Sequence, residues 1–158
     1  TPSSCAWNGV AMTRGAYCYG SYNNNGAPAV IFYLMNPTPG TGNVVYTAND
    51  KQYASAENWD RVSGVGASMK STASSQLSSF SFTFAKTNSL NVLIAAASLR
   101  SGTGWTPGSN TTEEADVGTT QPTHRLFFGR SETGSVIAAS CAGGANTFGA
   151  CALELVAG

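Results

Sequence analysis

Charged side chains are scarce in this sequence. Asp, Glu, Lys and Arg make up 10% of its 158 residues, and eight basic residues balance eight acidic ones, whereas about 25% of residues are charged in typical soluble proteins. The basic residues are scattered, which excludes the Lys and Arg clusters that bind nucleic acid or an anionic membrane surface. Two explanations of the low charge stay open: a surface covered by neighbouring subunits or glycans, and a plain Ser, Thr, Asn and Gly surface of the kind common outside the cell.

Long apolar runs are also missing. The longest run, around Val92–Ala97, is the length of a strand and falls far short of the roughly 18–20 residues that cross a bilayer. We therefore expect no membrane insertion. The hydrophobic fraction of 42% is nevertheless enough for a packed core, and the length fits a single domain over residues 1–158.

Catalytic motifs are lacking. The only histidine is His124, and a Ser-His-Asp triad would have to use it. No Gly-x-Ser-x-Gly turn is present to expose a nucleophile, and "PTHRLFF" indicates an ordinary strand histidine. We therefore predict that the protein is not an enzyme and binds no cofactor.

The acidic residues offer only one cluster, formed by Glu113, Glu114 and Asp116. Glycosidases place two carboxylates opposite each other across a cleft, and the sequence offers no second acidic cluster to oppose this one. Alternation along a strand predicts Glu114 and Asp116 on one face. A solvated sheet edge is the preferred interpretation, with a calcium site as the alternative, and we predict no metal site.

Four cysteines are present, Cys5, Cys18, Cys141 and Cys151, and none forms a C-x-x-C pair. Zinc is therefore not expected, and the even number favours disulfides in an oxidising compartment. Of the three pairings open to four cysteines, we prefer Cys5–Cys18 and Cys141–Cys151 because each closes a short loop. The alternative is four buried free thiols in a cytosolic protein.

The rest of the sequence predicts many short strands. Phe80, Phe82 and Phe84 alternate with Ser and Thr, as in a half-buried strand. The apolar run Ala29–Met35 is typical of a central strand buried on both faces, and Asn8-Gly9 predicts a type I′ hairpin turn. Further strands are expected over Asn43–Thr47, Leu90–Ser98, His124–Phe128, Val136–Cys141 and Ala150–Val156. Together they predict an all-β, antiparallel β-sandwich with a jelly-roll-like arrangement.

Several segments, taken in order, resemble a β-sandwich module of phage tail and virion proteins and of bacterial surface proteins. "TPSSCAWNGVAMTRG" is similar to its first hairpin, and "AVIFYLMNPTPGTGNVVYT" to two paired central strands. "NWDRVSGVGASMKSTAS" is similar to a crossover loop, "NSLNVLIAAASL" and "GWTPGS" to a strand and its turn, and "ACALELVAG" to the closing strand. The resemblance implies a jelly-roll-like sandwich on an extracellular or virion surface, without catalytic residues.

The sequence departs from this family pattern in two ways. The four cysteines are additions, and the apolar strand that usually precedes the hairpin is missing before Thr1. A sandwich that lacks a strand exposes unpaired backbone groups, so we expect a strand from another copy to fill the gap. The alternative is that the strand lies upstream in the same polypeptide, and a cleaved signal peptide would also fit a start at Thr1.

Two surface features suggest partners. A loop is expected over Tyr17–Asn25, where Tyr17, Tyr19 and Tyr22 are followed by three asparagines. Its aromatic and uncharged surface fits glycan or another subunit. Asn110 begins the Asn-Thr-Thr glycosylation sequon in a Gly, Ser and Pro loop. We predict a structural subunit of an extracellular filament or virion surface that associates as a homo-oligomer or polymer through β-strand edges. The alternative is a carbohydrate-binding or adhesive module.

Overall fold

The computed structural model describes residues 3–22, 25–48, 54–71, 78–100, 104–118, 124–141 and 148–158. Within these ranges the chain is all-β, and no helix is present that is long and apolar enough to cross a membrane. The strands are β1 (Ser4–Trp7), β2 (Val10–Ala11), β3 (Thr13–Tyr22), β4 (Asn25–Tyr33), β5 (Val44–Thr47), β6 (Val62–Lys70), β7 (Ser79–Thr83), β8 (Val92–Arg100), β9 (Trp105–Pro107), β10 (Thr112–Gly118), β11 (His124–Ser131), β12 (Val136–Cys141) and β13 (Phe148–Ala157).

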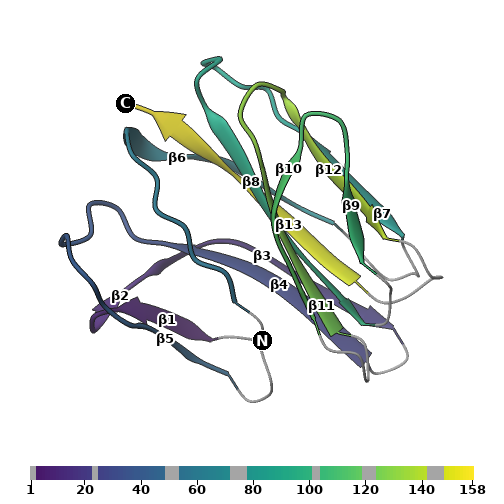
Figure 1. Cartoon of the computed structure of the whole chain (residues 1–158), viewed down its shortest axis with the longest axis horizontal. Helices are drawn as coiled ribbons and strands as arrows, with labels where there is room; N and C mark the ends of the chain where they lie inside the picture. The colour runs from purple at the N-terminus through teal and green to yellow at the C-terminus, as the bar shows by residue number, and fades with distance from the viewer. Residues whose placement is uncertain are drawn as a thin grey trace.

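A five-stranded sheet in the order β10-β11-β8-β13-β6 forms the middle layer of the molecule (Figure 1). The sheet β7-β12-β9 covers one of its faces, and the hairpin β3-β4 covers the other. Every pairing between the described strands is antiparallel. The prediction of an all-β antiparallel sandwich is therefore confirmed, while its jelly-roll connectivity stays a prediction.

Strand β8 is buried on both faces because it lies in the middle of the central sheet. Its alternate residues enter the two hydrophobic clusters: Leu93 and Ala95 face the β7-β12-β9 side, and Ile94 and Ala96 face the β3-β4 side. The prediction that Ala29–Met35 is the strand buried on both faces is wrong. The start of this run lies in β4, in an outer layer, where every second residue faces the core and its neighbours stay partly exposed.

The cluster beneath β7-β12-β9, the first core cluster, is rich in aromatic side chains. Phe80, Phe82 and Phe84 are all buried, as their alternation predicts. The Phe80 ring lies 5.8 Å from the Phe127 ring and 6.0 Å from the Trp105 ring, in edge-to-face arrangements that favour aromatic pairs. These aromatic contacts therefore hold the outer sheet β7-β12-β9 against the central sheet.

The second core cluster, beneath the β3-β4 hairpin, is built from smaller side chains. It contains Ala16, Cys18, Ala29 and Ile31 from the hairpin, packed against residues of β8 and β13. Small side chains allow the hairpin to approach the central sheet closely, as the geometry around Gly15 shows: a Cβ atom there would lie 2.8 Å from Leu153 Cδ2.

The first hairpin has the predicted turn. Asn8 and Gly9 have φ angles of 47° and 81°, and Trp7 pairs with Val10 across the turn. Positive φ at both central residues is what a type I′ turn requires. This hairpin forms the small sheet β2-β1-β5, which lies beside the sandwich and contributes no member to either core cluster (Figure 1).

Two details suggested by the family resemblance are wrong. The segment expected to be a crossover loop contains strand β6, which pairs with β13 at the edge of the central sheet. The two segments expected to pair as central strands do not pair: β4 pairs with β3, and β5 pairs with β1. The connection between Tyr33 and Val44 is long enough for β5 to lie outside the sandwich and to pair with β1 in the small sheet.

Candidate functional site

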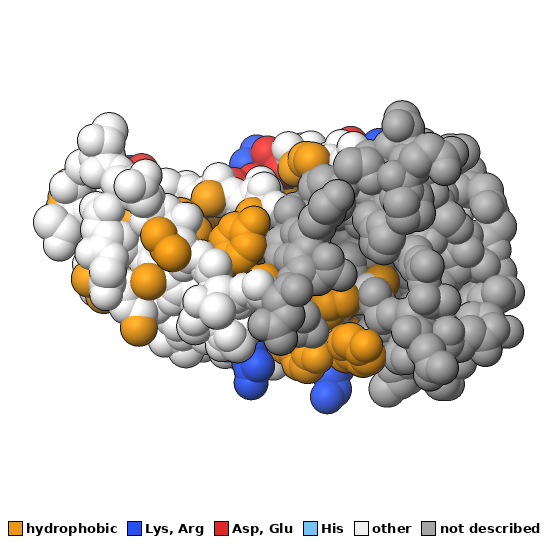
Figure 2. All heavy atoms as spheres, turned by 90° about the horizontal axis from the view of Figure 1, so that it is seen from below, with side chains coloured by type: hydrophobic (Ala, Val, Ile, Leu, Met, Phe, Trp, Pro, Cys, Tyr) orange, Lys and Arg blue, Asp and Glu red, His pale blue; other side chains and the backbone are white. Residues whose placement is uncertain are grey.

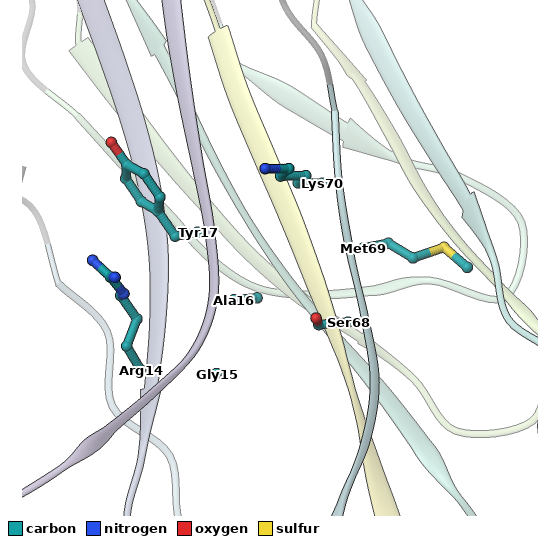
Figure 3. A pocket seen from close by; sticks show the side chains of 7 residues that line it. All are labelled: Arg14, Gly15, Ala16, Tyr17, Ser68, Met69 and Lys70. Carbon is teal, nitrogen blue, oxygen red and sulfur yellow. The ribbon is translucent and has the colours of Figure 1, made fainter.

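A shallow cleft lies between β3 and β6, with a volume of about 340 Å³ (Figure 3). Lys70 and Ser68 extend from β6 toward β3, whereas Arg14 and Tyr17 leave β3 on the side away from β6. The Arg14 guanidinium lies 5.4 Å from the centre of the Tyr17 ring, which is a cation–π contact. The lining residues include cations but neither a carboxylate nor a histidine, so they do not supply an acid–base pair.

The prediction of a loop over Tyr17–Asn25 is wrong, because strand β3 continues to Tyr22 and β4 begins at Asn25. Two of the three tyrosines predicted as contact residues lie on the outer face of the β3-β4 hairpin. Ala16 and Cys18 point inward, so Tyr17 and Tyr19 point outward, and Tyr19 is 51% exposed. The cross-strand neighbours are Val30 for Tyr17 and Pro28 for Tyr19. The side chain of Tyr22 lies outside the described residues. The hairpin thus brings two tyrosines together on an outer surface that also carries Arg14, and we call this surface the aromatic hairpin face.

The acidic cluster on β10 is paired with arginines of β11. Asp116 Oδ1 lies 2.8 Å from Arg125 Nε, and Asp116 Oδ2 accepts a hydrogen bond of 3.1 Å from the Trp105 backbone amide. Glu114 Oε1 lies 3.0 Å from Arg130 Nε. Since Arg125 and Arg130 are an odd number of residues apart on one strand, they lie on opposite faces of the sheet.

The prediction that Glu114 and Asp116 share a face is therefore wrong. A β-bulge between Glu113 and Ala115 adds a residue to β10 and reverses the alternation. The carboxylates diverge, each toward its own arginine. Burial and the nearby charge of Asp116 raise the pKa of Glu113, while Arg125 lowers it. No group of metal-ligating side chains is present in the described part of the chain.

A further charged group surrounds Arg130, and the sequence did not predict it. Arg130 lies over the Trp59 ring at 5.5 Å and contacts Glu132 at 3.1 Å as well as Glu114. Burial and the charge of Glu114 raise the pKa of Glu57, while Arg130 and a hydrogen bond with Trp59 lower it. These residues join the 54–60 segment to the edge of the central sheet. Their separation in sequence left no local pattern from which the group could be recognised.

The four cysteines are buried free thiols in the structure, so neither preferred disulfide is formed. The fold separates both pairs. Cys5 lies on the small sheet and Cys18 in the second core cluster, while Cys141 and Cys151 belong to clusters on opposite faces of the central sheet. Short spacing in sequence was therefore a poor guide, because consecutive strands belong to different layers here.

Asn110 lies in an exposed turn with φ of 61°, as its sequon context predicts, and its glycosylation stays a prediction. The neighbouring Thr111 is buried, and its hydroxyl accepts a hydrogen bond of 3.1 Å from the Ala138 amide. His124 begins β11, and its side chain lies outside the described residues.

The small sheet exposes an uncharged strand edge. In β5 every residue is exposed, with Val45 at 60% and Tyr46 at 41%. Strand β5 pairs with β1 on one side, and no described strand pairs with its other side. Figure 2 shows hydrophobic side chains on a largely uncharged surface at the end of the molecule that carries this sheet. We call this feature the β5 edge.

No family model, curated protein or solved structure matches the chain. The resemblance of its motifs to phage and bacterial surface modules therefore stays a prediction. The β5 edge and the aromatic hairpin face are the two features from which a function can be argued.

Proposed function

We propose that this chain is a structural subunit of an extracellular assembly, a filament or a virion or phage surface component, whose copies associate through β-strand edges. The observation that carries the proposal is the β5 edge, an exposed and uncharged strand with one side to which no described strand pairs. Such an edge presents unpaired N–H and C=O groups to solvent and is a template for another strand.

The two edges of the central sheet are protected by the means that proteins use against strand addition. Edge strand β10 carries Glu113, Glu114 and Asp116 together with a β-bulge. Edge strand β6 ends at Lys70, and its pairing with β13 is interrupted by register shifts. Bulges and charges on an edge hinder pairing with another chain. The β5 edge has neither, which distinguishes it from the two edges of the central sheet.

The partner that fits this edge best is a second copy of the same chain. Strands β1, β2 and β5 contain no charged residue, and the whole chain has a formal net charge of zero. Two copies therefore approach without the repulsion that keeps charged monomers apart. Val44, Val45 and Tyr46 of β5 are all at least 40% exposed in the single chain, and a neighbouring strand would cover part of their surface.

Sedimentation velocity over a range of concentrations, followed by negative-stain electron microscopy, tests this proposal. The wild-type chain is expected to form dimers or larger particles, and Val45→Lys is expected to keep it monomeric because a charge on an edge blocks strand addition. Val117→Lys is the matched control, since Val117 is 41% exposed on the already charged strand β10. A wild-type monomer at every concentration, or equal behaviour of the two variants, would contradict the proposal.

The aromatic hairpin face supports a second candidate, a carbohydrate-binding or adhesive module. Tyr17 and Tyr19 present ring faces and hydroxyl groups on an outer surface, and such side chains combine an apolar surface with a polar end. A glycan array probed with monomeric Val45→Lys protein tests this function. Binding that is lost in Tyr19→Ala would favour it over the structural role, whereas binding that is unchanged would exclude this face.

A further inference from the structure

The fold brings together one pair of cysteines that are far apart in the sequence. Cys18 on β3 and Cys151 on β13 are 3% and 0% exposed, and both belong to the second core cluster. Cys141 lies in the first core cluster, on the other face of the central sheet, and Cys5 lies on the small sheet. Only Cys18 and Cys151 therefore share a cluster.

Hydrogen bonds through Ser71 connect Cys18 to Ala150, the residue before Cys151. Cys18 Sγ lies 2.8 Å from the Ser71 carbonyl oxygen and 3.4 Å from its hydroxyl oxygen. The Ser71 amide donates to the carbonyl of Ala150 at 2.9 Å, and the Ala150 amide donates to the Ser71 hydroxyl at 3.1 Å. Since Ala150 precedes Cys151 directly, the Cys18 thiol is held next to this part of β13.

The surroundings of the Cys151 sulfur agree with this placement. Burial raises the pKa of Cys151, the nearby Cys18 thiol raises it further, and hydrogen bonding by the backbone of Cys18 lowers it. This environment is consistent with the core cluster that the two cysteines share.

The two layers also approach closely enough for a covalent link. Packed sheets ordinarily lie about 10 Å apart, whereas Cα atoms of β3 lie within 8 Å of Cα atoms of β13. Gly15 lies against Leu153, and Cys18 and Cys151 lie further along the same two strands, in one core cluster. Disulfides need a Cα separation of roughly 4.4–6.8 Å, which small side chains between the layers permit.

We propose that Cys18 and Cys151 form a disulfide that ties the β3-β4 hairpin to the central sheet when the chain folds with a disulfide oxidant such as oxidised glutathione. One cysteine thiolate attacks the sulfur–sulfur bond of the oxidant and releases one reduced glutathione. The other cysteine then displaces the second glutathione from the mixed disulfide. The cysteines lose two electrons and two protons, and the oxidant gains them as two thiols.

This disulfide forms before the layers close, because both sulfurs are buried in the folded chain and thiolate access controls exchange. Reduced protein refolded with oxidised glutathione, then denatured and alkylated without reductant, is expected to show two alkylated cysteines, Cys5 and Cys141. Its intact mass before alkylation should be about 2 Da lower than that of the reduced chain. A chymotryptic map should contain a peptide pair that joins Cys18 to Cys151.

Variants identify the pair independently of the map. Cys18→Ser should leave Cys151 open to alkylation after denaturation, while Cys141→Ser should keep the Cys18–Cys151 link and serves as the matched control. Since the link closes a long loop, the oxidised chain should unfold at a temperature higher by about 10 °C than the reduced chain. Four alkylated cysteines in refolded protein with a native β-sheet circular dichroism spectrum would overturn the proposal, as would a link between any other pair. The result does not depend on self-association, since a monomer forms the same link.

Discussion

At the residue scale, the clearest case of a buried polar group that needs its partner is Glu154. Its carboxylate accepts a hydrogen bond of 2.7 Å from Asn91 Nδ2 and one of 3.4 Å from the Ala67 amide. Asn91 is itself fully buried and accepts a hydrogen bond of 3.1 Å from the Ala157 amide. One asparagine therefore connects the start of β8 with the end of β13.

Replacing this asparagine is expected to destabilise the fold. Asn91→Ala leaves a Glu154 oxygen and the Ala157 amide without their partner inside the protein, which should lower the free energy of unfolding by about 1–3 kcal/mol. Urea denaturation measures the change. The exposed Asn58 provides the control, since Asn58→Ala should change stability by no more than about 0.5 kcal/mol. Equal effects of the two variants would contradict the role of Asn91.

The buried thiol of Cys151 predicts a loss of stability at alkaline pH in the reduced protein. Burial, reinforced by the Cys18 charge, raises the pKa of Cys151 from 9.0 to about 12. Between these values the unfolded chain releases the proton and the folded chain keeps it, so the unfolded state is increasingly favoured as pH rises. The protonated Cys151 thiol contributes its full share of the free energy of unfolding below pH 9. This contribution is lost between pH 9 and pH 12, at about 1.4 kcal/mol per pH unit.

Urea denaturation in reductant at a series of alkaline pH values tests this prediction. Cys151→Ala should show a smaller fall in the free energy of unfolding with pH than the wild type. Part of the fall should remain, because burial also raises the pKa of Cys5 and Cys141. Identical slopes in the two proteins would show that the Cys151 thiol does not titrate with folding.

At the scale of single elements, the sequence was most informative where local chemistry decides the structure. The Asn8-Gly9 turn and the alternating phenylalanines of β7 follow directly from the residues. The bulge in β10 could not be predicted, because its position depends on the pairing with β11. Strand β6 was also missed, since Gly64 and Gly66 interrupt its apolar pattern and its pairing with β13 is long-range.

The packing of β3 against β13 predicts a contrast between two glycines. A Cβ atom at Gly15 would lie 2.8 Å from Leu153 Cδ2 and 3.0 Å from Tyr33 Cδ1, whereas one at Gly64 would meet nothing within 4 Å. Gly15→Ala should therefore lower the free energy of unfolding by about 1–3 kcal/mol through overpacking. Gly64→Ala should be neutral or stabilise by up to about 1 kcal/mol. Thermal unfolding of both variants measures the contrast, and a neutral Gly15→Ala would mean that the layers separate easily.

At the scale of the whole molecule, the low charge and the uncharged β5 edge lead to the same expectation about how copies associate. Association driven by backbone pairing and by burial of uncharged side chains should depend little on ionic strength, because screening acts only on charges. We therefore expect the size distribution in sedimentation velocity to change little between about 50 mM and 500 mM NaCl. Dissociation of the particles as salt increases would indicate an ionic interface in place of the β5 edge.

The sequence by itself determined the all-β class, the first hairpin turn, the strands that alternate in polarity and the exposure of Asn110. These features depend on residues near one another in the chain, through backbone propensity, turn chemistry and alternation. Only the tertiary structure decided which strand is buried on both faces, which cysteines share a cluster and which edge stays open. These features depend on how layers stack and strands pair across long separations. Strand β4 pairs with β3 and not with β5, and Cys18 shares a core cluster with Cys151 and not with Cys5.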